Sequence, residues 1–282
     1  MIKANLTIFR FYLAIMDALS LYLSEKYTDS SIDNPDYFKT RIVHKIVLMF
    51  HTLDKLTQTT QDEVSCRCLL RGILDNVTTY CFIYDRDDKN EVLFRHYLYS
   101  IDGYICYKDN VVNGIMEKNS NYPFEQRCNE AINQYKEQLA CHPYSVLDNE
   151  AIKKLINNAN WKYESLQKTD GLRFRDMYLK IGLNKQLAEY YQSYLSQFVH
   201  GLSFSNIPCV SPEQIKNVLY ESIPLADRMI QAMCRTFPIE EMKQCISSAK
   251  TVKKIFKDPD LNVDDLFIFV KALVENDKTL LM

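Results

Sequence analysis

Apolar residues recur every three to four positions along most of this chain, which is the spacing of one face of an α-helix. The spacing predicts helices at about 5–26, 38–56, 61–84, 91–118, 124–140, 151–157, 172–181, 184–200, 212–235, 239–257 and 263–276. No segment alternates apolar and polar residues for long, as a half-buried strand would. The predicted fold class is therefore all-α, with more than about two-thirds helix and no sheet of three or more strands.

The predicted helix at 61–84 is the most apolar of the set. One stripe along it consists of Cys66, Leu70, Ile73, Val77, Tyr80 and Tyr84. Further apolar residues widen this stripe until the C-terminal half of the helix is apolar almost all round. A helix of that kind is buried on most sides, so we expect it to lie at the centre of the fold.

Residues with special backbone preferences mark several of the predicted boundaries. Asn184 is a favourable N-cap for the helix that follows it, and Gly201 is a stop signal directly after His200. Ser211 and Pro212 suit the N-cap and first position of the next helix. The stretch at 158–170, which holds the only tryptophan, is predicted to be irregular.

The length of 282 residues suits one large domain or a domain with helical additions. We predict a helical domain at 1–236 and a C-terminal helical extension at 237–282 that packs on it. No stretch reaches the roughly 18 apolar residues that a membrane helix needs, and no signal-peptide cleavage pattern is present. These features predict a cytoplasmic protein without a membrane partner.

The formal net charge of −2 supplies no general basic field for holding nucleic acid. Any contact with RNA or DNA would therefore need a local patch. The densest basic stretch consists of Lys250, Lys253, Lys254 and Lys257. Such a run is more typical of a solvated helix face than of a phosphate contact.

The nine cysteines are odd in number and include no CxxC pair. This favours reduced core thiols over a disulfide framework or a structural zinc site. The histidines lack metal-ligand spacing among themselves, and the acidic loop at 85–90 lacks the glycine of a calcium loop. Phosphate-binding and dinucleotide-binding glycine motifs are absent as well. We therefore expect no metal and no cofactor.

Two of the predicted helices carry charged and polar residues at positions where these residues could form a functional site. Arg71 and Asp75 lie one turn apart on the apolar helix at 61–84, and Arg67 lies one turn earlier. Charges in that setting must be paired or must face a cavity or interface. The group is therefore either a structural ion pair or part of a site.

The second group is Ser196 and His200, again one turn apart, on the polar face of the helix at 184–200. Tyr190 and Tyr194 lie nearby on the same helix. A solvated or structural histidine is one interpretation. Its place in the last turn favours a functional one, because a helix C-terminus stabilises protonated histidine.

Two blocks of sequence resemble a known family. Residues 70–84 (LRGILDNVTTYCFIY) resemble the Arg-x-x-x-Glu helix of a bacterial family of unknown function, numbered 5677. Residues 161–204 resemble its second signature, which runs from a Trp through a short Gly-bounded helix and a Tyr-rich helix to Ser-x-x-x-His-Gly. That ending reads Ser196 to Gly201 here. The blocks occur in the same order and cover about a fifth of the chain.

This family is similar to the HEPN superfamily of helical proteins, which is common in toxin–antitoxin and antiviral systems. The resemblance implies a HEPN-like helical bundle with additional N- and C-terminal helices. It also implies a homodimer and metal-independent cleavage of RNA. In the usual motif, four to six residues separate an Arg from the His that follows it. This chain departs from it, with Ser193, Tyr194 and Leu195 at those positions, and it has Asp75 where the family more often has Glu.

Two hypotheses follow. In the first, the chain is a HEPN-like endoribonuclease or toxin of a bacterial defence system. The resemblance then implies catalytic roles for His200, Arg71 and Asp75, with substrate contacts from Arg67, Tyr194 and Ser196. His200 would transfer a proton, Arg71 would stabilise phosphate charge, and Asp75 would orient Arg71. In the second, the chain is a non-catalytic helical protein that binds a partner protein, an antitoxin or a nucleic acid.

Overall fold

The computed structural model describes residues 2–59, 62–112, 124–147, 149–200 and 212–237. Helices make up about 80% of these residues, and the described part of the chain contains one sheet, which has two strands. The predicted all-α class is therefore confirmed at this level. No helix within the described ranges is long and apolar enough to cross a membrane.

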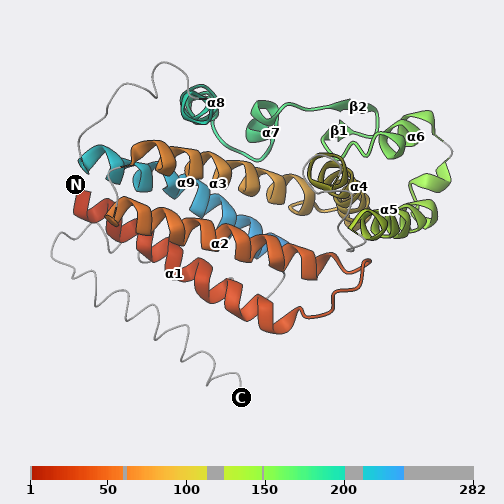
Figure 1. The fold of residues 1–282 in the computed structure, drawn as a ribbon, viewed down its shortest axis with the longest axis horizontal. Helices are drawn as coiled ribbons and strands as arrows, with labels where there is room; N and C mark the ends of the chain where they lie inside the picture. Colours follow the sequence, from red (N-terminus) through yellow and green to blue (C-terminus); the bar gives the residue numbers. More distant parts are fainter. Residues whose placement is uncertain (1, 60–61, 113–123, 148, 201–211, 238–282) are drawn as a thin grey trace. The chain divides into compact units, whose positions relative to one another are not determined.

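The chain divides into two units, each described here by itself. The first combines residues 1–28 and 36–81 with the chain from 178 onward. Its main helices are α1 (Ile2–Lys26), α2 (Pro35–Thr59), α3 (Glu63–Tyr84), α8 (Lys185–Val199) and α9 (Pro212–Thr236). Helix α1 packs along α9 (Figure 1).

The core of the first unit is built from the helical stripes of these segments. Phe9 of α1 and Phe50 of α2 are fully buried, with ring centroids 6.2 Å apart. The α3 stripe is also fully buried at Cys66, Leu70, Ile73, Val77 and Tyr80. Each large apolar side chain buried in this way contributes about 1.5–3 kcal/mol. The prediction that α3 is a central helix is confirmed.

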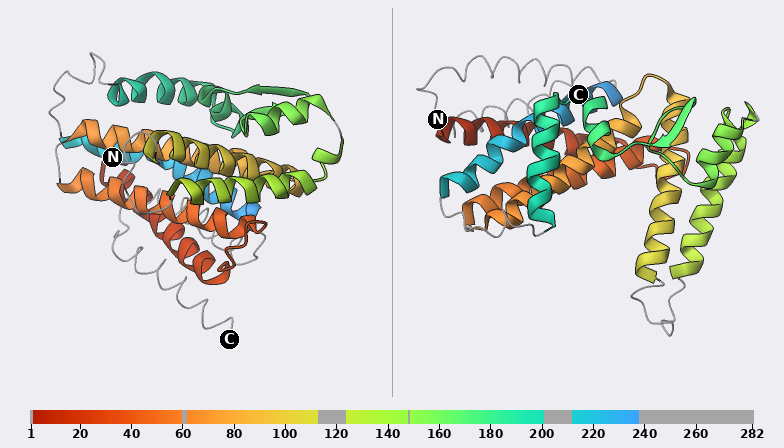
Figure 2. Two further views of the ribbon diagram at one scale, coloured as in Figure 1. Left: turned by 45° about the vertical axis from the view of Figure 1, so that its right-hand side comes forward. Right: turned by 90° about the horizontal axis from the view of Figure 1, so that it is seen from above.

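The second unit combines residues 29–35 with 82–177. It contains α4 (Lys89–Tyr107), a π-helical turn (Lys108–Val112), α5 (Phe124–Cys141), a 3-10 turn (Ser145–Leu147) and α6 (Glu150–Asn157). Strands β1 (Tyr163–Ser165) and β2 (Lys168–Gly171) follow, and α7 (Phe174–Lys180) leads into the first unit. Helices α4 and α5 lie side by side (Figure 2).

Buried Arg95 of α4 organises the second unit. Its Nη1 donates to the backbone oxygens of Trp161 and Tyr163, both at 2.9 Å, and its Nε donates to Glu91 at 2.9 Å. The guanidinium also lies 3.7 Å from the centroid of the Tyr163 ring. Burial lowers the pKa of Arg95 from its ordinary value. These contacts fix the chain around Trp161 against α4.

The prediction that the stretch at 158–170 is irregular is wrong. Strands β1 and β2 form an antiparallel pair there, with Tyr163 opposite Gly171 and Ser165 opposite Lys168. The carbonyl contacts of Arg95 and the full burial of the Tyr163 side chain hold β1 in place. Strands this short carry no readable alternation, so the pattern of apolar residues did not reveal them.

Most helix boundaries agree with the predicted ones to within a few residues. The Asn184 side chain accepts a hydrogen bond from the backbone N–H of Leu187, as expected for an N-cap. Helix α9 begins at Pro212 and contains Pro224 within it. The helix predicted at 91–118 is α-helical only to Tyr107 and continues as the π-helical turn. Three predictions concern residues outside the described ranges. They are the helices at 239–257 and 263–276, the extension at 237–282 apart from Phe237, and the lysine run beginning at Lys250.

Candidate functional site

Arg71 and Asp75 form an ion pair on α3. The Arg71 Nε lies 3.2 Å from each carboxylate oxygen of Asp75, across one helical turn. The Arg71 side chain is 14% exposed and that of Asp75 is 33% exposed. The pair is therefore neither sealed in the core nor fully hydrated.

Helix α8 brings a second partner to Arg71. Figures 1 and 2 show α8 crossing the direction of α3 steeply. At this point the Arg71 Nη1 donates a hydrogen bond of 3.0 Å to the Ser196 Oγ. Three of the predicted site residues are thus joined in one hydrogen-bonded group.

Tyr178 of α7 completes this group. Its hydroxyl donates a hydrogen bond of 2.7 Å to the Oδ1 of Asp75, and its ring centroid lies 5.8 Å from the Arg71 guanidinium. Burial, followed by the charge of Asp75, raises the pKa of Tyr178 well above its ordinary value, so the hydroxyl keeps its proton at neutral pH. Tyr178 could not be identified from the sequence, because a buried tyrosine on a short helix resembles any other core residue.

His200 lies one turn beyond Ser196 and is the C-cap residue of α8. Its backbone N–H donates to the Ser196 carbonyl oxygen at 3.1 Å, and its side chain is exposed. Within the described ranges, its ring makes no hydrogen bond or ion pair. The histidine is therefore open to solvent at the end of the helix that holds Arg71 through Ser196.

Arg67 has a different environment from Arg71. It is 4% exposed, and its guanidinium contacts Glu63 at 2.5 Å and Glu221 of α9 at 2.6 Å. Burial opposes the charge of Arg67, but the two carboxylates outweigh this effect and raise its pKa. Arg67 thus connects α3 with α9 from a buried position, where a large substrate cannot reach it.

Tyr194 covers the Arg67 guanidinium. The guanidinium lies 4.6 Å from the centroid of the Tyr194 ring and 5.2 Å from that of Phe198. Tyr190 stacks on Tyr194 with ring centroids 5.1 Å apart. These aromatic residues pack α8 onto the buried cation, which is a structural role that the sequence did not distinguish from substrate binding.

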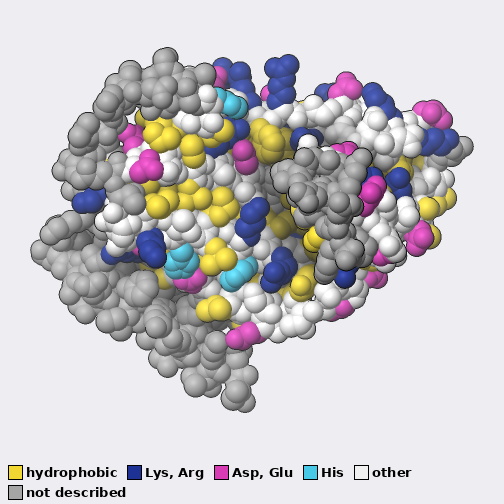
Figure 3. All heavy atoms as spheres, viewed as in Figure 1, with side chains coloured by type: hydrophobic (Ala, Val, Ile, Leu, Met, Phe, Trp, Pro, Cys, Tyr) yellow, Lys and Arg dark blue, Asp and Glu magenta, His cyan; other side chains and the backbone are white. Residues whose placement is uncertain are grey.

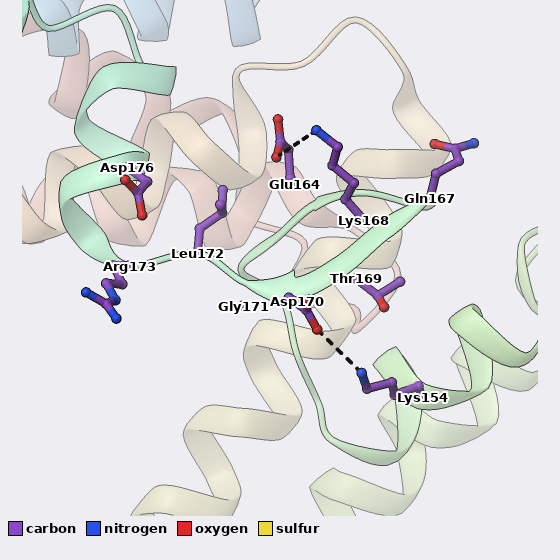
Figure 4. Close-up of a pocket in the computed structure, with 10 residues that line it drawn as sticks. All are labelled: Lys154, Glu164, Gln167, Lys168, Thr169, Asp170, Gly171, Leu172, Arg173 and Asp176. Carbon is purple, nitrogen blue, oxygen red and sulfur yellow. Dashed lines mark hydrogen bonds and ion pairs between the residues drawn. The ribbon is translucent and has the colours of Figure 1, made fainter.

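A surface pocket in the second unit is a separate feature from this group. It has a volume of about 560 Å³ and is lined by the β-hairpin and its neighbours (Figure 4). Lys154 pairs with Asp170 at 3.5 Å, and Lys168 pairs with Glu164 at 3.7 Å. Because its charges largely neutralise one another, the pocket offers no concentrated field for an ionic ligand.

The surface charge and the placement of possible metal ligands bear on the chemistry of this group. Over α2 and α3, the face shown in Figure 3 mixes apolar side chains with both signs of charge, and its described part shows no continuous basic area. In the part of the chain that the structure describes, no group of three or more His, Cys, Asp or Glu residues could hold a metal ion. The described groups around Arg71 and the end of α8 include a guanidinium, a carboxylate, hydroxyls and an imidazole.

Comparison with known proteins adds no further information. No family model, no curated protein and no solved structure matches the chain.

Proposed function

We propose that this chain is a HEPN-like, metal-independent endoribonuclease in which Arg71 and His200 act on one phosphodiester. The observation that carries the proposal is the 3.0 Å hydrogen bond from Arg71 to Ser196, one turn before exposed His200. In this arrangement Arg71 of α3 supplies the guanidinium that the Arg-His motif of α8 lacks. The bacterial defence setting comes from the resemblance described above.

The bonding state of Arg71 supports a role in holding phosphate. A guanidinium has five N–H donors, and Arg71 uses one on Asp75 and one on Ser196. The Tyr178 hydroxyl is a further hydrogen-bonding neighbour of Arg71, so these three residues together use only part of its five donors. Planar N–H donors match phosphate oxygens, and a charge-assisted bond of this kind is about twice as strong as a neutral one.

The proposed reaction is transesterification at a ribose. Neutral His200 takes the proton of the 2′-hydroxyl, and the 2′-oxygen forms a bond to phosphorus while the bond to the 5′-oxygen breaks. The 5′-oxygen receives a proton, and the products are a 2′,3′-cyclic phosphate and a 5′-hydroxyl. One imidazole cannot hold both roles at the same moment, so the second proton transfer would come from the other His200 of a two-fold homodimer. Arg71 would stabilise the charge on the phosphate.

A second candidate function is a non-catalytic interaction protein. Two observations favour it: Arg71 is only 14% exposed, and the described residues give His200 no hydrogen-bond partner to orient its ring. General bases in enzymes are usually oriented by a further group. In this alternative the Arg71 group is a polar packing contact between α3, α7 and α8, and the helical surface binds a protein or nucleic-acid partner.

Cleavage of total RNA in the presence of EDTA distinguishes these functions. We expect the full-length chain to produce fragments with cyclic phosphate ends, and His200→Ala to reduce the rate by at least about 100-fold. His51→Ala is the matched control, because His51 is also an exposed histidine of the first unit and pairs with Asp17 instead. Equal cleavage by all three proteins, or none by the wild type, would overturn the endoribonuclease proposal. Binding of RNA or protein without cleavage would favour the second candidate.

A further inference from the structure

We infer that Tyr178 is a positioning residue that holds the Arg71 guanidinium in one orientation through Asp75. The consequence for RNA rests on the proposed function, but the positioning itself does not. Tyr178 is fully buried, so it cannot touch a polynucleotide. Its hydroxyl donates to the Asp75 carboxylate and also interacts with Arg71 itself, so its effect on a substrate passes through these two side chains.

The geometry shows why Asp75 needs a second contact. Its side chain is 33% exposed, and an exposed ion pair of this type contributes only about 0.2–1 kcal/mol. A carboxylate held by such a pair alone can rotate about its side-chain bonds. The 2.7 Å hydrogen bond from Tyr178 Oη to Asp75 Oδ1 restricts that rotation, because the tyrosine ring is buried and the bond is charge-assisted.

The fixed carboxylate in turn fixes Arg71. Both Asp75 oxygens lie 3.2 Å from the Arg71 Nε, while Ser196 contacts Nη1 at 3.0 Å. Two contacts at different nitrogens define the plane of the guanidinium. The N–H donors that these contacts do not use then keep one direction, which is the preorganisation that an anion-binding group requires. The ligand class is therefore an oxyanion such as a phosphodiester.

The first unit contains a matched tyrosine for comparison. Tyr12 of α1 donates a hydrogen bond of 2.9 Å to Asp227 Oδ1 of α9, and its side chain is 4% exposed. This pair has the same chemistry as Tyr178 and Asp75. Tyr12→Phe therefore controls for the loss of one buried tyrosine–carboxylate bond, since this pair joins α1 to α9, whereas Arg71 and Asp75 lie on α3.

Hydrogen exchange at the Arg71 Nε–H, followed by ¹⁵N NMR, tests the inference without reference to activity. The signal is assigned by its loss in Arg71→Lys. We expect Tyr178→Phe to accelerate exchange roughly tenfold, as removal of one charge-assisted bond allows, and Tyr12→Phe to leave it unchanged. Equal exchange rates in the wild type and Tyr178→Phe would overturn the inference. If Tyr178→Phe does not fold, 3-fluorotyrosine placed at position 178 alone provides the test, because its more acidic hydroxyl strengthens the bond to Asp75 and should slow the exchange. An unchanged exchange rate in that protein would overturn the inference.

RNA cleavage provides the second measurement. If the wild type cleaves RNA, Tyr178→Phe should lower kcat with little change in KM, whereas Tyr12→Phe should alter neither. If Tyr178→Phe accelerates the Nε–H exchange of Arg71 but leaves kcat unchanged, the positioning of Arg71 by Tyr178 does not contribute to catalysis. A wild type that does not cleave RNA would refute the proposed function, and the exchange rates would still decide whether Tyr178 positions Arg71.

Discussion

The Arg71 Nη1 donates a 3.0 Å hydrogen bond to the Ser196 Oγ, although the two residues stand 125 positions apart in the chain. This contact joins helix α3 to helix α8. It places Arg71 beside the helical turn that precedes His200. It also gives a polar side chain on an apolar helix the partner that its partial burial requires.

Ser196→Ala should remove one of the two anchors of Arg71. We expect a loss of stability of about 1 kcal/mol, which is typical for one hydrogen bond, and roughly tenfold slower RNA cleavage. Chemical denaturation and a fluorescent cleavage assay measure these effects. Ser193→Ala is the control, because Ser193 is an exposed serine on the same helix. The same losses in Ser193→Ala would show that the effect is not specific to the Arg71 contact.

Arg67→Met should destabilise the first unit far more than Arg71→Met does. Removing Arg67 leaves Glu63 and Glu221 without their shared cation, and breaking a buried pair of this kind costs about 3–5 kcal/mol. The Arg71 pair is more exposed, so its loss should cost about 1 kcal/mol or less. Urea denaturation of both variants measures the difference. Equal midpoints would contradict the structural role assigned to Arg67.

Cysteine reactivity should separate buried thiols from exposed ones. Burial, together with the nearby acidic charges, raises the pKa of Cys66 to about 11, and its side chain is fully buried. Cys106 and Cys141 are exposed. At pH 8, a disulfide reagent followed by peptide mapping should modify Cys106 and Cys141 in the native protein and leave Cys66 unmodified. Rapid modification of Cys66 would contradict its placement in the core.

Acid should destabilise the second unit through His142. The ring Nδ1 accepts the backbone N–H of Tyr144 at 3.2 Å, and Nε2 lies 3.0 Å from the Asn90 carbonyl oxygen. This arrangement requires the neutral ring, and burial lowers the pKa of His142 from its ordinary value. The unfolded chain takes up the proton near pH 6.5 and the folded chain does so only at lower pH. The stabilising contribution of the neutral ring is therefore fully present above about pH 6.5 and declines below it.

The measurement is the free energy of unfolding between pH 8 and pH 5. We expect a decline below about pH 6.5 whose slope, from this one group, approaches but does not exceed about 1.4 kcal/mol per pH unit. His142→Asn keeps an acceptor for the Tyr144 N–H and cannot titrate, so its decline should be shallower. An equal or steeper decline in this variant would show that His142 is not responsible.

Helical periodicity was sufficient to predict most of the fold. It located α2, α3 and α5 because each buries a long apolar stripe, and Asn184 fixed the start of α8 through its side-chain cap. The β-hairpin was missed because its order depends on Arg95, which lies 68 positions before Tyr163 in the chain. A contact between distant residues leaves no periodic signal near either of them.

The candidate site was predicted in part. The spacing of Arg71 and Asp75 predicted their ion pair, whereas the hydrogen bond from Arg71 to Ser196 depends on how α8 packs on α3. Arg67 has the same helical spacing, but it is buried against Glu221 and the α8 tyrosines. Those contacts depend on how three helices pack, so the sequence did not reveal the structural role of Arg67. The expectation of core cysteines was wrong for Cys106 and Cys141, which are exposed.

Cleavage of an oligonucleotide that contains one ribonucleotide within DNA is the most direct test of the central claim. The rate in EDTA is measured for the wild type, His200→Ala, Arg71→Gln and the double variant. The proposal predicts cleavage only after the ribonucleotide, a loss of at least about 100-fold in each single variant, and little further loss in the double variant. Cleavage that persists in either single variant, or that also occurs in an all-DNA strand, would contradict joint action of Arg71 and His200 on a ribose phosphodiester.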